Sequence, residues 1–141
     1  MAGKIIQRIF VDMMEYGDLT LYLASSGKGA IKVGIRMAGD EDPVSFFSPF
    51  FPKATLIRSA KHNTFLATAI RAALGGKPLP NSFCLDVQLT PFQHAAYQCI
   101  SRIPYGQTMT YGEVASAMGL PRAARAVGQA MRVNPLPIIF P

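Results

Sequence analysis

The sequence is poor in the side chains that build metal sites and disulfide frameworks. Its 141 residues include two cysteines, Cys84 and Cys99, and two histidines, His62 and His94. These four residues do not have the spacing of a zinc site, and so few thiols suit a reducing compartment rather than a disulfide-held scaffold. We therefore expect no metal and no cofactor.

Long apolar runs are also missing. A membrane-spanning helix needs about 20 consecutive apolar residues, whereas the nearest candidate, residues 44–51, is short and is interrupted by Pro49. The apolar N-terminal run is broken by Gln7 and Arg8, which makes it a poor match to a signal peptide. We expect no membrane partner and a cytoplasmic location, or a nuclear one in a eukaryote.

Acidic residues are scarce, because 8 Asp and Glu stand against 14 Lys and Arg and give a net charge of +6. Residues 1–86 hold 10 basic and 7 acidic residues, and residues 87–141 hold 4 and 1, so each part carries +3. This excess fits an anionic partner such as nucleic acid, although an ordinary basic protein has the same composition. A hydrophobic content of 50% is enough for one or two small domains.

The first half of the chain predicts a small antiparallel sheet. Residues 5–14 suit a strand, and apolar residues alternate with others over 19–24 and 31–37, which predicts a β-hairpin around the loop 25–29. The glycines of that loop fit a turn and not a phosphate-binding loop. Asn63 or Thr64 is expected to cap a helix over 65–74, which Gly75 and Gly76 end.

Two segments of this half invite a functional interpretation. The acidic trio at residues 40–42 is interpreted as a solvated loop rather than a metal site. The phenylalanines that follow it are interpreted as core or interface packing, because base-stacking surfaces usually interleave aromatic with basic residues. They are Phe46, Phe47, Phe50 and Phe51.

A composition change marks the expected domain boundary. Residues 77–81 have the prolines of a linker. Phe83, Leu85 and Val87 then alternate with other residues and predict one short strand. The predicted domains are residues 1–86 and residues 87–141.

The second half predicts helices. Thr90–Gln93 and Thr110–Glu113 are capping boxes. The first box starts a helix whose apolar face includes Cys99, which predicts a buried structural thiol. The second box starts a helix that Gly119 ends, and another helix is expected from about Pro121 to Val133. Residues 137–141 predict a buried strand.

The two helices joined by a tight turn predict a helix-turn-helix. The second of them is rich in small residues, and its charged residues are Arg122, Arg125 and Arg132. Small side chains permit a close approach, and arginines favour an anionic partner. The pair is therefore a candidate for lying against DNA.

At these residues the sequence resembles a known family. The stretch IPYGQTMTYGEVASAMGLPRAARAVGQAMRVNPLPIIFP, residues 103–141, is similar to the DNA-binding half of the alkylguanine-DNA alkyltransferases, the methylated-DNA–protein-cysteine methyltransferases. The likeness covers residues 89–141 without a gap, and its core R-A-V-G-x-A-x-x-x-N-P is far more selective than a generic helix-turn-helix pattern.

The resemblance implies an α+β fold and a function. It implies a ribonuclease H-like antiparallel sheet with a helix, followed by a helical domain with a winged-helix-like helix-turn-helix. It also implies DNA repair on double-stranded DNA containing alkylated guanine, through one transfer of the alkyl group to a protein cysteine after base flipping.

The resemblance also assigns roles to matching residues. Arg125 would enter the base stack from the minor groove in place of the flipped nucleotide. Tyr111 would press on the adjacent phosphate and, with Met131, line the base pocket, while Asn134 would support the turn that leads to the reactive residue. The other expected DNA contacts are Thr110, Ala123, Ala124, Ala126, Gly128 and Arg132.

In the family the acceptor cysteine would directly follow Pro141, with a histidine that activates it and a glutamate that orients the histidine. No catalytic residue is therefore expected within residues 1–141, and we expect this polypeptide to be inactive in alkyl transfer. We expect a monomer when the chain continues past Pro141 and self-association without that continuation, because residues 137–141 would then expose an apolar patch.

Two other interpretations stay open. The first is a lesion-binding protein that has no acceptor cysteine and flags damage for excision repair, and the N-terminal domain argues against it. The second is a helix-turn-helix regulator, and the R-A-V-G-x-A motif argues against that.

Overall fold

The structure is a computed structural model that describes residues 7–80 and 82–140. The chain divides into two compact units, residues 1–69 with 80–86 and residues 70–79 with 87–141. These units differ from the predicted domains in the placement of residues 70–79, which include the end of a helix that begins in the first unit.

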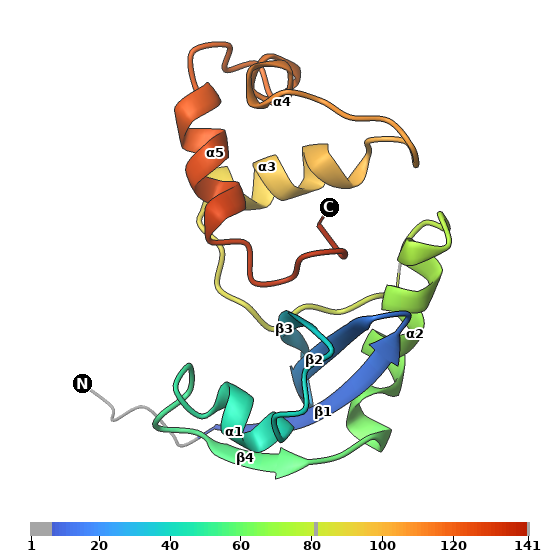
Figure 1. Cartoon of the computed structure of the whole chain (residues 1–141). Helices are drawn as coiled ribbons and strands as arrows, with labels where there is room; N and C mark the ends of the chain where they lie inside the picture. Colours follow the sequence, from blue (N-terminus) through green and yellow to red (C-terminus); the bar gives the residue numbers. More distant parts are fainter. Residues whose placement is uncertain (1–6, 81, 141) are drawn as a thin grey trace, which may run out of the picture. The chain divides into compact units, whose positions relative to one another are not determined.

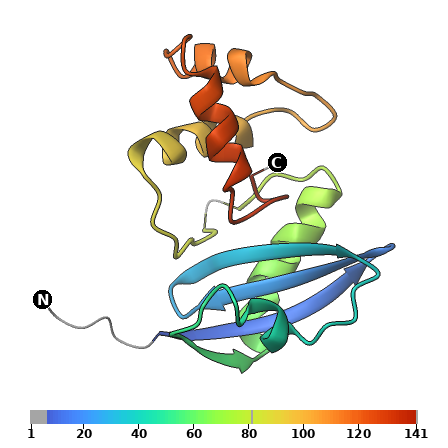
Figure 2. The ribbon, with the colours of Figure 1, turned by 60° about the vertical axis from the view of Figure 1, so that its left-hand side comes forward.

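The first unit is built on a four-stranded sheet (Figure 1). The strands β1 (Arg8–Tyr16), β2 (Leu19–Ser26), β3 (Gly29–Met37) and β4 (Thr55–Arg58) lie in the order β3-β2-β1-β4. Strands β1, β2 and β3 pair antiparallel, and β4 pairs parallel to β1. The predicted hairpin is confirmed as β2 and β3, whose long twisted strands are clearest in Figure 2.

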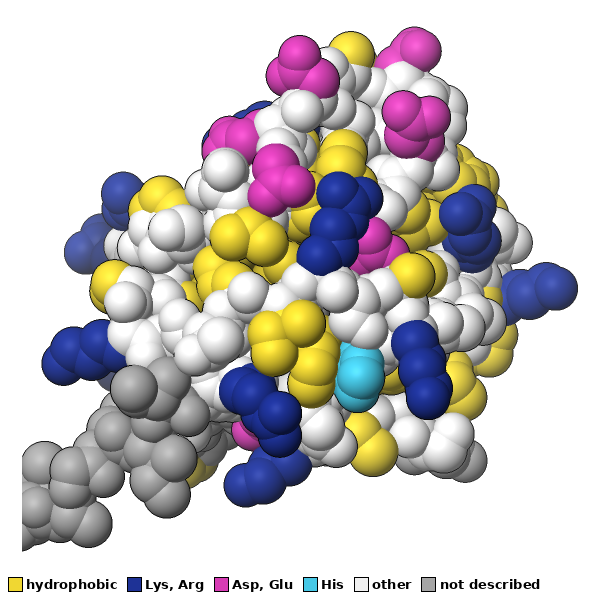
Figure 3. All heavy atoms as spheres, turned by 90° about the horizontal axis from the view of Figure 1, so that it is seen from below, with side chains coloured by type: hydrophobic (Ala, Val, Ile, Leu, Met, Phe, Trp, Pro, Cys, Tyr) yellow, Lys and Arg dark blue, Asp and Glu magenta, His cyan; other side chains and the backbone are white. Residues whose placement is uncertain are grey.

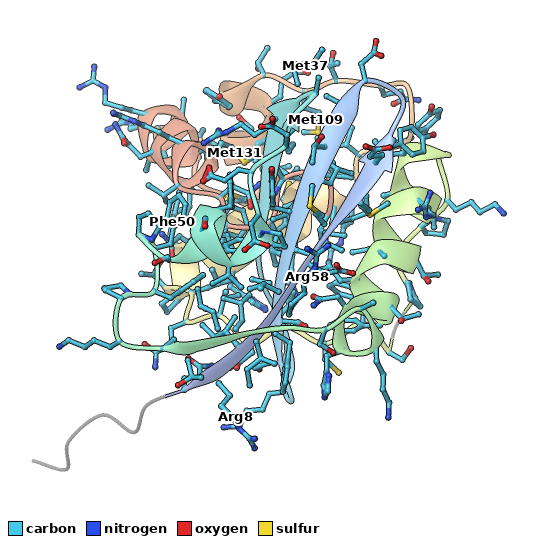
Figure 4. The ribbon with its side chains drawn as sticks, turned by 60° about the horizontal axis from the view of Figure 1, so that its bottom comes forward. Arg8, Met37, Phe50, Arg58, Met109 and Met131 are labelled. Atoms are coloured by element: carbon cyan, nitrogen blue, oxygen red, sulfur yellow. The ribbon has the colours of Figure 1, made fainter. Side chains whose placement is uncertain are left out.

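The segment between β3 and β4 packs its aromatic residues on the sheet. Helix α1 (Pro43–Phe47) begins at Asp42, whose carboxylate accepts hydrogen bonds from the backbone N–H groups of Val44 and Ser45. Phe46 is buried, and its ring stacks on Tyr22 of β2 at a centroid distance of 4.1 Å. Core packing is therefore confirmed for Phe46, and also for the buried Phe47, whereas Phe50 is 51% exposed (Figure 4).

The acidic trio has a structural use in this unit. Besides capping α1, Asp42 lies 3.6 Å from Nη1 of Arg58, and Nε of Arg58 lies 3.6 Å from Oδ1 of Asp12. Both ion pairs found among residues 7–80 and 82–140 thus involve Arg58 of β4 (Figure 4). Figure 3 shows most of the acidic side chains on the face seen from below gathered towards one end, with lysines and arginines spread across that face.

The predicted caps of the next helix are wrong. A 3₁₀ turn (Lys61–Asn63) leads straight into α2 (Thr64–Leu74), so neither side chain is needed at a free helix end. The Asn63 amide instead donates to the carbonyl oxygens of Phe10 and Ser59, and the Thr64 hydroxyl donates to that of Ala60. The predicted glycine end is confirmed, since Gly75 directly follows the helix and the next residue, Gly76, has φ of +81°.

The predicted short strand over residues 83–87 is also wrong. Only Leu85 forms a bridge, with Ala30 at the start of β3. The N–H of Ala30 donates to the Cys84 carbonyl at 3.0 Å, and the N–H of Asp86 donates to the Ala30 carbonyl at 2.8 Å. The alternating apolar residues of 83–87 thus correspond to a single bridge at the edge of the sheet and not to a fully paired strand.

The second unit contains α3 (Pro91–Ser101), α4 (Tyr111–Ala117) and α5 (Ala124–Arg132). Both predicted capping boxes are confirmed, with the Thr90 and Thr110 hydroxyls accepting from the N–H groups of Gln93 and Glu113. The three helices share a core made of Ile100, Val114, Ala115 and Val127. Cys99 packs against this core, as predicted.

The last described residues form a turn and not the predicted strand. Ile138 has φ of +77°, a left-handed conformation that is unfavourable for a β-branched side chain and incompatible with a strand. The N–H of Phe140 donates to the Leu136 carbonyl, and the Phe140 ring stacks on Tyr97 of α3. Leu136, Ile139 and Phe140 are buried, so these side chains do not form the exposed apolar patch that was predicted.

Candidate nucleic-acid interface

Helices α4 and α5 form the predicted helix-turn-helix, with a shorter second helix than expected. Helix α4 ends at Ala117, and Gly119, shortly after it, has φ of +76°. Pro121 does not begin α5, because the N–H of Ala123 donates to the Leu120 carbonyl and residues 121–123 belong to the turn. Helix α5 begins at Ala124, and its N-cap, Ala123, supplies no side-chain hydrogen bond.

Helix α5 presents a polar face and an apolar face. Val127 and Ala130 are buried, and Ala123 and Met131 pack against the core. Residues 125, 129 and 132 are spaced by four and three positions, which places them together on the opposite side of a helix. Arg125, Gln129 and Arg132 are all exposed there. Gln129 was not predicted, although its spacing from the two arginines was visible in the sequence.

The small residues of α5 do not share one face. A helix turns by about 100° per residue, so the predicted set is distributed around the axis. Ala123 packs against the core, Ala124 is half-buried and Ala126 is exposed. Gly128 is half-buried at the side of α5 that meets Tyr111.

The arginines of this region are not neutralised within the described chain. Arg122, Arg125 and Arg132 are exposed, and neither ion pair among residues 7–80 and 82–140 includes them. The one acidic residue of the second half, Glu113, already accepts a hydrogen bond from the backbone N–H of Thr110. Positive charge therefore faces solvent along α5 and the turn before it, which favours an anionic partner.

Tyr111 and Thr110 lie at the start of α4. Tyr111 is the first residue of the helix and is 53% exposed. One edge of its ring faces Gly128 of α5. The Thr110 hydroxyl accepts from the N–H of Glu113 at 3.0 Å.

Met131 and Asn134 have clear structural contacts. Met131 is half-buried and packs against the core, as does Met109 from the segment before α4 (Figure 4). The Asn134 amide nitrogen donates to the Phe140 carbonyl at 2.7 Å, and its oxygen accepts from the N–H of Leu136 at 2.9 Å. Asn134 thus holds the turn that follows α5 at both of its ends.

Two described side chains of the second unit, Glu113 and Tyr97, have a shifted pKa. Hydrogen bonds from the backbone and side chain of Thr110 lower the pKa of the Glu113 carboxyl, which keeps the capping box ionised in mild acid. Burial raises the pKa of the Tyr97 hydroxyl. Both effects belong to groups that fasten helices and not to a group on the exposed face of α5.

Neither cysteine lies on α5. Cys99 lies on α3 against the core, and Cys84 lies in the first unit, where its sulfur contacts the Ser82 carbonyl. Among the described residues, no three His, Cys, Asp or Glu side chains are grouped as metal ligands would be. Within the same residues, no helix has the length and apolar character of a membrane span.

The geometry defines an α+β protein that presents a basic helix-turn-helix, and comparison with known proteins agrees. The model of the 6-O-methylguanine DNA methyltransferase, DNA binding domain, matches residues 91–141. The inducible methylated-DNA–protein-cysteine methyltransferase of Bacillus subtilis is 30% identical over 133 residues, which is 94% of this chain and 74% of that protein. The probable enzyme of Acanthamoeba polyphaga mimivirus is 32% identical over 111 residues, 78% of this chain and 73% of that protein.

Solved structures give the same result. The crystal structure of Mycobacterium tuberculosis OGT in complex with DNA aligns with a TM-score of 0.67 and 28% identity, covering 94% of this chain and 75% of that one. A crystal structure of the O6-methylguanine methyltransferase of the same organism aligns with a TM-score of 0.69 over the same shares. The protein belongs to the methylated-DNA–protein-cysteine methyltransferase family, and the predicted fold class is confirmed.

Proposed function

We propose that this protein acts in DNA repair by binding double-stranded DNA that contains alkylated guanine, with the helix-turn-helix of α4 and α5 on the DNA. The observation that supports this most directly is the exposed face of α5, where Arg125 and Arg132 have no carboxylate partner among the described residues. Arginine on such a face suits phosphate and base contacts.

Within this proposal each side chain has a role. Arg125 enters the minor groove and occupies the place of the flipped guanine, so it offsets part of the unstacking cost of a few kcal/mol. Tyr111 presses on the phosphate beside that nucleotide, and Thr110 and Arg132 contact the backbone. Ala126 lies on the exposed side of α5 and permits close approach, whereas Ala123 and Ala124 contribute mainly through packing at the core side.

The proposed reaction is direct reversal of the damage by one transfer of the alkyl group to a cysteine sulfur. Neither cysteine of residues 1–141 suits the role of acceptor, since Cys99 is packed against the core and Cys84 lies outside the helix-turn-helix. We therefore propose that residues 1–141 bind the lesion without taking up the alkyl group. Met131, packed beside the core, and Asn134, which holds the following turn, support the pocket in a polypeptide that carries the acceptor.

A binding titration tests the interface. Arg125→Ala should weaken binding to a fluorescein-labelled duplex with one O6-methylguanine by at least tenfold, a loss of about 1.4 kcal/mol. Arg8→Ala is the matched control, because it removes the same charge from an exposed position of β1 in the first unit (Figure 4). Equal losses for the two variants would contradict the assignment of α5 to the DNA.

Intact mass spectrometry tests the chemistry. After incubation with the methylated duplex, the mass of the 141-residue polypeptide should stay unchanged. A gain of one methyl group on Cys84 or Cys99 would overturn the proposal that these thiols are not acceptors. Sedimentation of the same sample checks the oligomeric state, for which self-association stays a prediction.

A further inference from the structure

Gly128 of α5 lies directly against the ring of Tyr111 at the start of α4. A Cβ atom built on Gly128 would lie 3.2 Å from both Cδ2 and Cε2 of Tyr111. Carbon atoms in favourable contact are about 3.5–4.0 Å apart. An alanine at position 128 would therefore require the tyrosine ring to move by a few tenths of an ångström, and a larger side chain would require a larger movement.

The contact is not required for the fold of either helix. Gly128 has no left-handed backbone conformation, since its φ is not among the positive values of the chain. Glycine inside a helix is less stable than alanine by about 1 kcal/mol, so the residue weakens α5 at this position. Tyr111 is 53% exposed, so the contact leaves much of the tyrosine in solvent. Stability therefore does not explain why glycine occupies position 128 against the Tyr111 ring.

We propose that Gly128 is a positioning residue for Tyr111: its missing side chain lets the edge of the tyrosine ring rest on α5, the helix that also carries the exposed Arg125 and Arg132. This inference rests on the proposed function, in which Tyr111 contacts a DNA phosphate. It gives Gly128 a role that acts through Tyr111, in place of the predicted direct contact between Gly128 and the groove. A displaced ring carries its hydroxyl away from the phosphate, and binding weakens although both helices remain intact.

Graded substitutions separate this role from a structural one. Gly128→Ala should weaken binding of the O6-methylguanine duplex about threefold, and Gly128→Leu about tenfold, the same loss expected for Tyr111→Ala. The melting temperature of the Gly128→Ala variant should rise, because alanine favours the helix. Gly112→Ala is the matched control, since its Cβ would meet only the Thr110 hydroxyl, at 3.8 Å. It should raise the melting temperature and leave binding unchanged.

A double-mutant cycle separates a role through Tyr111 from a clash with DNA. In a Tyr111→Ala background the Gly128→Ala and Gly128→Leu substitutions should change the dissociation constant by less than about 1.5-fold, because the ring that they displace is gone. The same losses in both backgrounds would show a direct clash between residue 128 and the DNA, and would overturn the inference.

NMR spectra of the free protein test the contact without DNA. The ring current of Tyr111 should shift the Hα resonances of Gly128, and these resonances should therefore move in Tyr111→Leu. Unchanged Gly128 resonances would overturn the inference whatever the binding data show. If the resonances move but Tyr111→Ala binds as tightly as the original protein, the phosphate role of Tyr111 in the proposed function fails, and the positioning role fails with it.

Discussion

The hydroxyl group of Tyr97 donates a 2.6 Å hydrogen bond to the backbone carbonyl oxygen of Ala130, and thereby fastens the middle of α3 to the last turn of α5. Tyr97 is 1% exposed and Ala130 is 4% exposed, so water does not replace this bond if it is lost. The carbonyl groups of a last helical turn have no partner within the helix. Tyr97 therefore satisfies one of them and fixes the helix that carries Arg125.

Tyr97→Phe should lower the free energy of unfolding by about 1–2 kcal/mol, the usual cost of leaving a buried carbonyl without its donor. Urea denaturation followed by circular dichroism measures the change. Tyr105→Phe is the control, since Tyr105 is 73% exposed and its variant should stay within about 0.5 kcal/mol. Equal effects of the two substitutions would contradict the importance of this bond.

Ionisation of Tyr97 should also lower the stability of the folded protein in alkaline solution. Burial raises the pKa of its hydroxyl above the ordinary value of 10.0, so its contribution to stability is complete below about pH 10 and is lost as the pH rises through the pKa of the folded protein. Tyr97→Phe cannot ionise at this position. Its stability should therefore fall less steeply than that of the original protein above about pH 10.

Glu113 should give the opposite pH dependence, because its contribution to stability is lost in acid. Hydrogen bonds from Thr110 lower the pKa of its carboxyl. Its contribution is therefore present above the unfolded-state pKa of about 4.3 and is lost as the pH falls through the lower pKa of the folded protein. Glutamine also completes a capping box, so Glu113→Gln keeps the geometry without the titration. The melting temperature of the original protein should fall more than that of Glu113→Gln between about pH 5 and pH 3. Parallel curves would contradict a role for this carboxylate.

Asn134→Ala should open the turn after α5. It removes the acceptor for the N–H of Leu136 and the donor to the Phe140 carbonyl, a cost of about 1–3 kcal/mol for the buried groups left unpaired. Hydrogen exchange at the Leu136 amide should become faster. Asn134→Asp keeps an acceptor there, so it should retain protection at Leu136 although it loses the bond to Phe140. Loss of protection in both variants would mean that the turn opens as a whole.

The salt dependence of DNA binding checks the electrostatic part of the proposed function. Each phosphate contact contributes about 0.9 to the slope of log K against log salt concentration. Arg132→Ala should therefore reduce the slope by about 0.9, and Arg8→Ala should leave it unchanged. An affinity that does not vary between about 50 and 200 mM salt would contradict backbone contacts altogether.

Features that depend on neighbouring residues could be predicted from the sequence. The Thr90 and Thr110 capping boxes and the hairpin of β2 and β3 need only short-range patterns, and all three are found in the structure. Strand β4 was missed, because four residues carry no periodicity and their partner, β1, lies more than 40 residues earlier in the chain. The same limit explains the false strand at residues 83–87, where only Leu85 finds a partner.

The interface was predicted unevenly for a similar reason. The family resemblance supplied Arg125 and Tyr111, and the structure places both on the exposed side of the helix-turn-helix. It could not show which side of α5 faces the core. In the structure Ala123 packs against the core, and Gly128 lies against the Tyr111 ring of α4. Ile138 was beyond prediction, because nothing local marks a β-branched residue for a φ of +77°.

The bridge between Ala30 and Leu85 bears on how separate molecules behave in solution. Strand β3 is an outermost strand of the sheet, and such strands offer unpaired N–H and carbonyl groups to other chains, which is a route to aggregation. Residues 84–86 occupy both groups of Ala30, and Gly29 lies so close that a Cβ there would be 2.6 Å from the Cys84 backbone. The connecting segment thus also protects the first part of that strand from pairing with another chain. Detaching this segment should promote aggregation before the protein unfolds.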